Sequence, residues 1–276
     1  MPGTARKPAR RRAQSRRRRE PRRILNCLSS RDTERDWRFE DAADAGVLEA
    51  PARIPPSKDL REIWWKIGDQ GSTGSCVGWA AADSVIRWHL VRAAWLPKEQ
   101  PLSPRFIWMA AKETDEFMSR PTTFIETDGT SLKAALDIAR KYGVVTDTVL
   151  PFSGGRLYQG RAMTFYALAA KLKIAGYFNL GKKPAEWRTW LATNGPILTR
   201  LDVDETWDAA KTTQGNLDVY LPDTTRGGHA VALVGYTPDR FIVRNSWGLG
   251  WGDKGFGYAS LPYAQAAFTE AYGAFL

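Results

Sequence analysis

The stretch Gly68-Asp69-Gln70-Gly71-Ser72-Thr73-Gly74-Ser75-Cys76 leads into residues 75–92, a segment without proline. Apolar side chains would occupy nearly every face of this segment as a helix, so we expect the helix to be buried. A cysteine at a helix N-terminus meets unpaired backbone N–H groups and the positive end of the helix dipole, and both favour its thiolate. Cys76 is therefore a candidate nucleophile. A buried free cysteine that packs as a small hydrophobe is an equally simple interpretation of this stretch alone.

The chain has two histidines, His89 and His229, and they decide which residue can act as the base. A thiolate that attacks a carbonyl needs a partner that takes up a proton and later protonates the leaving amine. His89 lies on the same expected helix, about 20 Å from Cys76 at about 1.5 Å per residue. We therefore expect His89 to be a packed or surface residue and His229 to be the base.

The surroundings of His229 predict a partner for its ring. Residues 230–236 and 241–245 read as strands joined by a turn, and the second ends at Asn245. In an antiparallel hairpin centred near Thr237, positions that sum to about 474 face each other, which places Asn245 opposite His229. The amide of Asn245 would then accept one ring N–H and fix the tautomer presented to sulfur.

Three ordered blocks resemble the papain (C1) family of cysteine peptidases, in a bacterial type without the usual disulfides. They are Gln70 through Cys76, Gly228-His229-Ala230-Val231, and Asn245-Ser246-Trp247-Gly248 followed by Gly250-Trp251-Gly252. Leu102-Ser103-Pro104 and Asn194-Gly195-Pro196 extend the similarity over residues 56–265. The resemblance implies an α+β, papain-like two-lobed fold, with a helical lobe, a β-rich barrel-like lobe and the active-site cleft between them.

The resemblance also implies the chemistry. A Cys76 thiolate and a His229 imidazolium would attack a peptide carbonyl, form a thioester and leave it to hydrolysis, with Asn245 orienting the ring. Gln70 matches the family's oxyanion donor, an effect commonly worth about 3 kcal/mol per donor. Trp247 would shield the bond between Asn245 and His229 from water.

Further residues are expected to contact substrate. Trp247 and Gly228, beside the histidine, belong to this set. Gly129 aligns loosely with the glycine that pairs with substrate backbone, although a plain turn fits it too. The wall of the substrate pocket falls near Thr199, Arg200 and Leu201. If Arg200 points into the pocket, acidic or polar side chains would be preferred over large apolar ones.

The sequence departs from the family in three places. Thr73 stands where a cysteine is usual, so a nearby disulfide is absent, and Val77 replaces an aromatic residue after the nucleophile. About fifty residues of tail and connector hold no ordinary inhibitory prosegment. The second of the two cysteines, Cys27, is expected to be an ordinary thiol near a flexible tail.

Charge separates the N-terminus from the rest. Eleven of the 40 Lys and Arg residues precede Asn26 with a single acid, Glu20, so the remainder is formally neutral. Residues 1–26 are therefore expected to be a disordered Arg-rich tail that binds nucleic acid or anionic surfaces nonspecifically, or is simply solvated. No transmembrane helix or secretory signal is visible, which predicts a cytoplasmic location with non-classical export left open.

The remaining pattern predicts an extended connector at 27–55 and a peptidase domain at 56–276. The helical lobe spans about 70–165, and the β-rich lobe spans about 166–276 with a strand at 56–69. Helices are expected at 75–92, 104–113, 131–142 and 187–193, and strands at 196–203, 230–236, 241–245 and 257–261.

The sequence thus predicts a cysteine-type peptidase acting on peptides or proteins, with no metal or cofactor. A peptide-binding pseudo-peptidase and an acyl-transfer enzyme with the same residues are alternatives, as is a nucleic-acid-associated protein that works through its tail. Substrate, activation and oligomeric state are left open.

Overall fold

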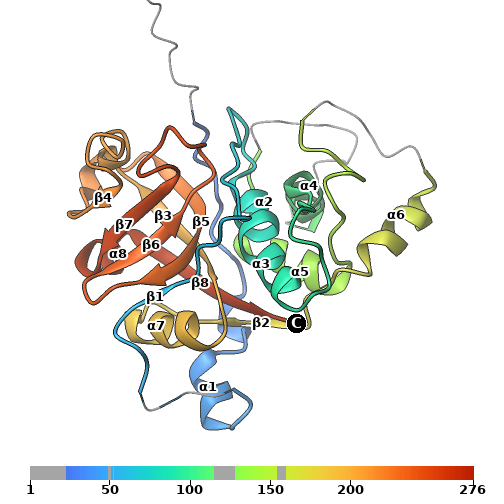
Figure 1. Ribbon diagram of the computed structural model, residues 1–276, viewed down its shortest axis with the longest axis horizontal. Helices are drawn as coiled ribbons and strands as arrows, with labels where there is room; N and C mark the ends of the chain where they lie inside the picture. The colour runs from blue at the N-terminus through green and yellow to red at the C-terminus, as the bar shows by residue number, and fades with distance from the viewer. Residues whose placement is uncertain (1–22, 49–50, 52, 115–127, 154–159) are drawn as a thin grey trace, which may run out of the picture.

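The computed structural model describes residues 23–48, 51, 53–114, 128–153 and 160–276. Two lobes lie side by side, a sheet with its covering helices and a group of helices (Figure 1). This arrangement confirms the predicted α+β fold. Nearly all of the expected Arg-rich tail, residues 1–22, lies outside the described residues.

The helical lobe is built around the segment that begins with Cys76. Gly78 faces the backbone of Pro104 so closely that an added Cβ would lie 2.2 Å from its carbonyl oxygen, which brings this segment against the next helix. The Ser131 hydroxyl accepts a hydrogen bond from Ala134 N and caps another helix. The elements are α2 (Cys76–Gly78), the π-helix η2 (Trp79–Ile86), α3 (Arg87–Arg92), α4 (Pro104–Thr114), α5 (Leu132–Lys141) and α6 (Ala162–Ala169).

The other lobe is organised by a sheet that holds eight strands within the described residues. Its order is β2-β8-β3-β5-β6-β7-β4, and β1 pairs with β5. Helices α7 (Pro184–Thr193) and α8 (Leu261–Ala267) pack against it. The strands are β1 (Lys58–Asp59), β2 (Gly176–Asn179), β3 (Ile197–Val203), β4 (Asn216–Leu217), β5 (Gly227–Tyr236), β6 (Arg240–Arg244), β7 (Phe256–Ser260) and β8 (Phe268–Phe275). Short 3-10 turns lie at η3 (Glu205–Trp207) and η4 (Pro222–Thr224).

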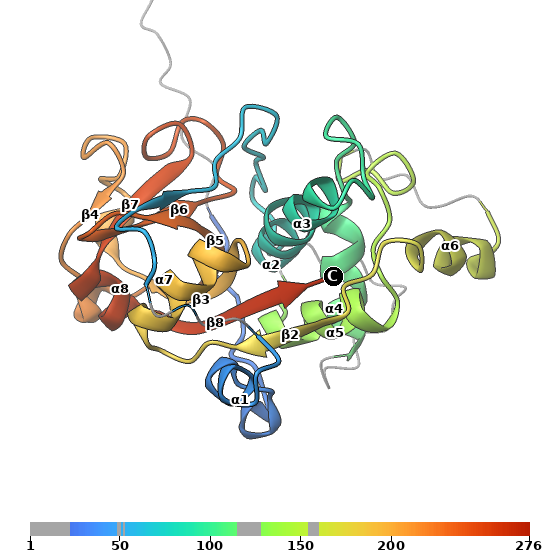
Figure 2. The same cartoon turned by 60° about the horizontal axis from the view of Figure 1, so that its bottom comes forward.

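The two lobes share strands and a core. Strands β2 and β8 extend from the sheet towards the helical lobe, where the chain ends (Figure 2). One buried cluster joins the helical lobe to the facing side of the sheet, and it contains both Cys27 and Cys76. The hydrophobic core is therefore continuous from one lobe to the other.

The hairpin that carries His229 differs from its predicted register. Strands β5 and β6 pair Ala232 with Arg244 and Tyr236 with Phe241, so the pairing sum of 474 is wrong. The turn is centred beyond Thr237, and a β-bulge between Leu233 and Gly235 shifts the pairing further.

The connector expected at 27–55 is not extended throughout. It contains η1 (Thr33–Arg35) and α1 (Phe39–Asp44). Phe39 is buried with its ring 5.8 Å from that of Trp190, so α1 is part of the second core. The strand expected at 56–69 is limited to β1.

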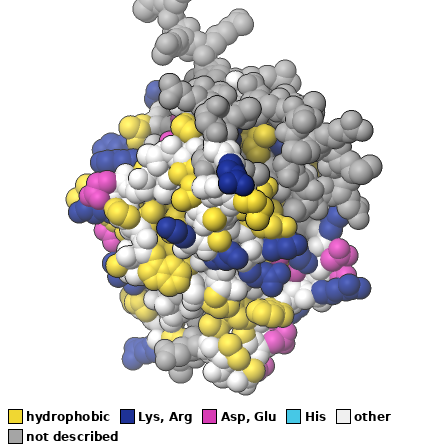
Figure 3. Space-filling model, turned by 90° about the vertical axis from the view of Figure 1, so that its right-hand side faces the viewer, with side chains coloured by type: hydrophobic (Ala, Val, Ile, Leu, Met, Phe, Trp, Pro, Cys, Tyr) yellow, Lys and Arg dark blue, Asp and Glu magenta, His cyan; other side chains and the backbone are white. Residues whose placement is uncertain are grey.

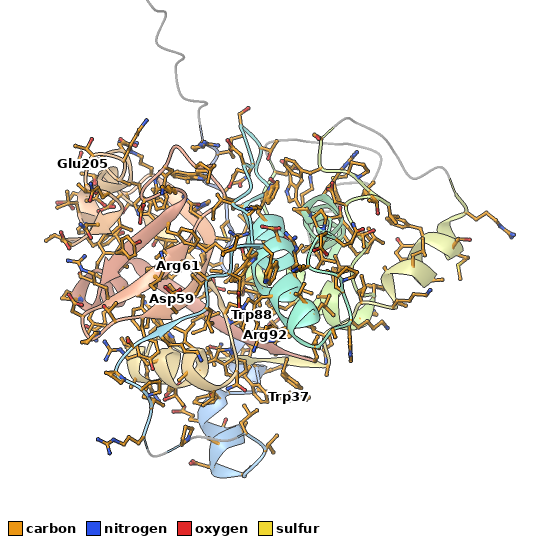
Figure 4. All side chains as sticks on the ribbon, in the orientation of Figure 1. Trp37, Asp59, Arg61, Trp88, Arg92 and Glu205 are labelled. Atoms are coloured by element: carbon orange, nitrogen blue, oxygen red, sulfur yellow. The ribbon has the colours of Figure 1, made fainter. Side chains whose placement is uncertain are left out.

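The surface of the described domain has mixed charge on the face that Figure 3 shows, where basic and acidic side chains alternate with hydrophobic ones. On α3, the guanidinium of Arg92 lies 5.8 Å from the ring of Trp88 (Figure 4). Among the described residues no helix combines the length and apolar character needed to cross a membrane.

Candidate active site

Cys76 is the first residue of α2 and is fully buried. The neighbouring Cys27 thiol is the largest influence on the pKa of Cys76, and the nearby imidazole of His229 acts in the same direction. Together they hold the pKa of Cys76 well below its ordinary value although burial opposes them. The sulfur is therefore favoured as a thiolate, as the sequence predicts.

His229 lies on β5 on the opposite side of the cleft, paired with Leu201 of β3. Its Nε2 is 2.9 Å from Oδ1 of Asn245, the first residue after β6. Nδ1 has no hydrogen bond to oxygen or nitrogen among the described residues, and it is the nitrogen left for the sulfur. The structure thus brings Cys76, His229 and Asn245 together in spite of the register error, because Asn245 lies beyond the end of the β5–β6 pairing.

Gln70 is buried and its amide is held from two directions. Oε1 accepts a hydrogen bond from the Ser246 hydroxyl at 2.8 Å, and Nε2 donates to Thr73 O at 3.0 Å. An amide nitrogen carries two hydrogens, so one N–H remains available for another acceptor. The contact with Ser246 also ties the loop before Cys76 to the residue that follows Asn245.

Three tryptophans surround the histidine on the sheet side. The ring of Trp247 lies 4.9 Å and that of Trp207 lies 5.6 Å from the ring of His229, and Trp251 packs on both. His229 and Asn245 are both buried beside these rings, and the shielding role of Trp247 stays a prediction. Trp207 was missed, because it stands outside the three motif blocks and nothing in its own neighbours distinguishes it.

A buried ion pair joins the two walls next to this site. Arg244, the neighbour of Asn245, donates from Nη2 to Asp83 Oδ2 of η2 at 2.6 Å and to Lys66 O at 2.8 Å. Asp83 also pairs with Arg87, one helical turn further along, at 3.0 Å. Removing one partner of such a buried pair would leave an uncompensated charge, so these contacts fix the position of Asn245 relative to the helix of Cys76.

The cleft is occupied by the chain itself. Residues 23–36, which we call the N-terminal segment, pass between the two lobes on their way to α1 (Figure 1). Cys27 N donates to Gly228 O at 3.0 Å, and Leu28 N donates to Thr130 O at 3.1 Å. Gly129 faces Asn26 so closely that an added Cβ would lie 1.7 Å from the Asn26 carbonyl oxygen. The two glycines predicted to contact substrate thus contact this segment.

Arg200 of β3 also contacts the N-terminal segment. Its Nε donates to Cys27 O at 3.0 Å and its Nη1 to the Thr269 hydroxyl at 2.7 Å, while Asp202 lies 3.0 Å from Nη1. The guanidinium therefore lies at the cleft with its charge paired. The preference for acidic side chains stays a prediction.

Arg23 fixes the other end of the occupied stretch. Its guanidinium donates to Asp69 Oδ1 at 2.7 Å, to Gly71 O at 3.0 Å and to Trp247 O at 2.9 Å. At Cys27, whose carbonyl Arg200 holds, the buried thiol lies in the same cluster as Cys76. The expectation of an ordinary thiol near a flexible tail is wrong for Cys27, since partners from distant parts of the sequence hold it in the cleft.

A family profile described as "Papain family cysteine protease" matches residues 54–266. The chain belongs to the papain family of cysteine proteases. This membership confirms the predicted cysteine peptidase at the level of the family.

The relatives of this papain-family protease are distant in sequence. It is 27% identical to Cathepsin B-like CP3 of Giardia intestinalis over 229 residues, which covers 78% of the chain and 72% of that relative. It is 36% identical to Cathepsin B-like cysteine proteinase 5 of Caenorhabditis elegans over 83 residues, which covers 29% of the chain and only 23% of that relative.

Solved structures agree with the fold. Xylellain, a cysteine protease from Xylella fastidiosa, matches with a TM-score of 0.74 at 21% identity, over 93% of the chain and 97% of xylellain. The Carica candamarcensis cysteine protease CMS1MS2, solved in complex with E-64, matches with a TM-score of 0.58 at 19% identity, over 80% of the chain and 99% of that protein. The papain-like two-lobed fold is thereby confirmed.

Proposed function

We propose that this papain-family protease hydrolyses peptide bonds with Cys76 as nucleophile, His229 as base and acid, and Asn245 and Gln70 as supporting residues. The contact of 2.9 Å between His229 Nε2 and Asn245 Oδ1 carries the proposal, because it turns the other ring nitrogen towards the buried thiol. The depressed pKa of Cys76 supports the same assignment.

The reaction begins when the Cys76 thiolate attacks the carbonyl carbon of the substrate. The negative charge that develops on the carbonyl oxygen is stabilised by the free N–H of Gln70 and by the backbone N–H of Cys76. The His229 imidazolium then gives its proton to the leaving amine, and the C–N bond breaks to leave a thioester. Water, deprotonated by His229, attacks the thioester, and the acid product leaves as the thiolate is restored.

Substrate needs space that the N-terminal segment now fills. A groove of about 1020 Å³ begins beside Arg23 and Leu25 and continues past Trp247 and Trp251. Its lining includes basic and acidic side chains as well as these rings. A peptide can extend into this groove, but a substrate carbonyl reaches Cys76 only after residues 26–28 move away.

Labelling with E-64, an epoxide that alkylates activated thiols, tests the assignment. The wild type, Cys76→Ala and His229→Ala are compared in a Cys27→Ser background, so that a single thiol or none remains. We expect labelling at Cys76 that Cys76→Ala abolishes and His229→Ala greatly slows. Labelling at an unchanged rate without His229 would contradict the assigned roles, and so would an absence of peptide cleavage by a labelled wild type.

A further inference from the structure

We propose that Cys27 and Cys76 form a reversible disulfide that holds the N-terminal segment in the cleft and inactivates the enzyme under oxidising conditions. The inference rests on the proposed function of Cys76 as nucleophile, and it assigns to Cys27 the role of its resolving thiol. The pair would make the peptidase responsive to peroxides.

The first observation is the meeting of the two thiols. Cys27 and Cys76 lie in the same buried cluster, both are free, and each thiol shifts the pKa of the other. They are also the only two cysteines of the chain, so an intramolecular disulfide has no other pairing. Cys76 is 49 residues further along the sequence, and the segment brings the thiols together through contacts other than those of the sulfurs.

These contacts anchor the N-terminal segment on both walls of the cleft. Cys27 itself is held through its N–H by Gly228 O and through its carbonyl by Arg200. Beyond it, Ser30 N donates to Glu270 Oε1 at 2.9 Å, and Asp36 Oδ1 lies 2.6 Å from Lys133 Nζ. With Arg23 at the other end, the backbone places the Cys27 side chain at the nucleophile before any covalent bond forms.

The carbonyl of Cys27 is bonded on the sheet side of the cleft. The carbonyl of Cys27 accepts its hydrogen bond from Arg200, on the sheet side. The Gln70 amide instead bonds Thr73 O and the Ser246 hydroxyl. Arg200, and not a proposed oxyanion donor, therefore holds the carbonyl of Cys27.

The two thiols are chemically suited to different steps. The pKa of Cys76 is well below the ordinary thiol value, whereas burial, followed by the neighbouring Cys76, raises the pKa of Cys27 well above it. The Cys76 thiolate attacks a hydroperoxide, an S–O bond forms, the O–O bond breaks, and the alkoxide or hydroxide released takes up a proton. The Cys27 sulfur then attacks the sulfenic sulfur, the S–S bond forms, and hydroxide leaves with the Cys27 proton as water. Two electrons pass from the two thiols to one peroxide.

The disulfide would have two effects. It removes the nucleophile from catalysis, and it joins the blocking segment covalently to the site. It also protects Cys76, because a sulfenic acid that finds no thiol proceeds to sulfinic acid, which dithiothreitol does not reverse. A thiol reductant would restore both cysteines and free the segment.

The test compares the full-length wild type with Cys27→Ser after treatment with hydrogen peroxide. We expect the wild type to lose nearly all activity and to regain nearly all of it in dithiothreitol, with a peptide pair joined through Cys27 and Cys76 in non-reducing mass maps. Cys27→Ser, which keeps a hydrogen-bonding side chain, should lose activity under the same treatment and recover little, with Cys76 found as sulfinic or sulfonic acid.

A matched variant separates this inference from the proposed function. His229→Ala keeps both cysteines. If treatment with glutathione disulfide joins the Cys27 and Cys76 peptides in this variant, the disulfide forms independently of peptidase activity. If no variant cleaves peptides but the joined peptides are found, the proposed function is wrong and the inference about the two thiols stands. The inference would be overturned if the wild type and Cys27→Ser recovered activity equally in dithiothreitol. It would also be overturned if disulfides formed only between chains, or if folded protein gave no joined peptides.

Discussion

The N-terminal segment and the start of α2 each bring one buried thiol to the same point, yet the two thiols are affected in opposite directions. Burial dominates Cys27 and raises its pKa, and the nearby Cys76 and Glu270 act in the same sense. At Cys76, the neighbouring Cys27 thiol and the imidazole of His229 outweigh burial and lower its pKa. Equal burial therefore gives unequal thiols, and the neighbours of each sulfur decide which one reacts.

The two regions also differ in how their position is maintained. Cys76 is placed by helix α2 and by its own loop, whereas Cys27 depends on single hydrogen bonds to Gly228 and Arg200. A position held by a helix changes little when one contact is lost. A position held by separate polar contacts can be released, which is what a blocking segment in front of a catalytic site requires.

The largest effect is expected from His229→Ala. Loss of the base and of its charge should lower kcat/KM for a peptide substrate by at least about 10³-fold, because nucleophile and base act as a unit. Cys27→Ala, the same change at the other region, should change kcat/KM in reducing buffer far less, because Cys27 takes no part in the proposed reaction. If His229→Ala lowered kcat/KM by less than about tenfold, which corresponds to about 1.4 kcal/mol, the two regions would not differ as proposed.

Gln70→Ala should produce the next largest effect. Removing one oxyanion donor is expected to lower kcat by about 10²–10³-fold with a smaller change in KM, because the donor acts mainly on the transition state. Gln100→Ala is the matched control, a half-buried glutamine that bonds Pro101 O in another loop. Steady-state kinetics of both variants checks the prediction, and equal effects at the two glutamines would count against it.

The pH dependence of alkylation sharpens the comparison between the thiols. In the absence of substrate, Cys27→Ala removes the largest influence that lowers the pKa of Cys76, so this pKa should rise. The thiolate exists above the pKa, and the rate of reaction with iodoacetamide should therefore reach its midpoint at higher pH than in the wild type. Cys27→Ser should restore part of the shift, because a hydroxyl also donates a hydrogen bond. Coincident midpoints for all three proteins would show that Cys27 does not affect the nucleophile.

The helix of Cys76 and the main strands could be predicted because their signals are local. Residues 75–92 without proline became α2, η2 and α3, and the apolar run after Gly228 became most of β5. The partner of His229 was found although the register was wrong, because the bulge near Val234 moves the pairing without moving Asn245 out of reach. The bulge itself depends on contacts from other strands, such as Lys58 against Gly235, which no local pattern reveals.

The occupied cleft could not be predicted in the same way. The partners of Arg23 are 46 to 224 residues away, and Arg200 is 173 residues from Cys27. Arginines and prolines near residue 23 indicate a solvated tail by composition, and only the folded sheet supplies the carbonyls and carboxylates that hold the segment. Strands β2 and β8 and helix α8 were missed for a related reason. They add to a sheet whose central strands are formed by other parts of the sequence.

Arg23→Ala should give the smallest effect, and it tests how weakly the N-terminal segment is held. The ion pair with Asp69 is partly exposed, with 17% and 49% of the two side chains accessible, so it is expected to contribute about 0.2–1 kcal/mol. Its loss should shift the segment towards the released form and raise kcat/KM in reducing buffer by at most about fivefold.

Arg61→Ala is the control for this change. Arg61 pairs with Asp59 on the surface of the sheet lobe and lies over the ring of Phe256, so it has contacts of the same kind at another place (Figure 4). We expect its kcat/KM to match the wild type. A rise in both variants would point to a general effect of surface charge. A fall in Arg23→Ala alone would mean that Arg23 assists substrate binding at Trp247, and the N-terminal segment would then have to be regarded as part of the working site.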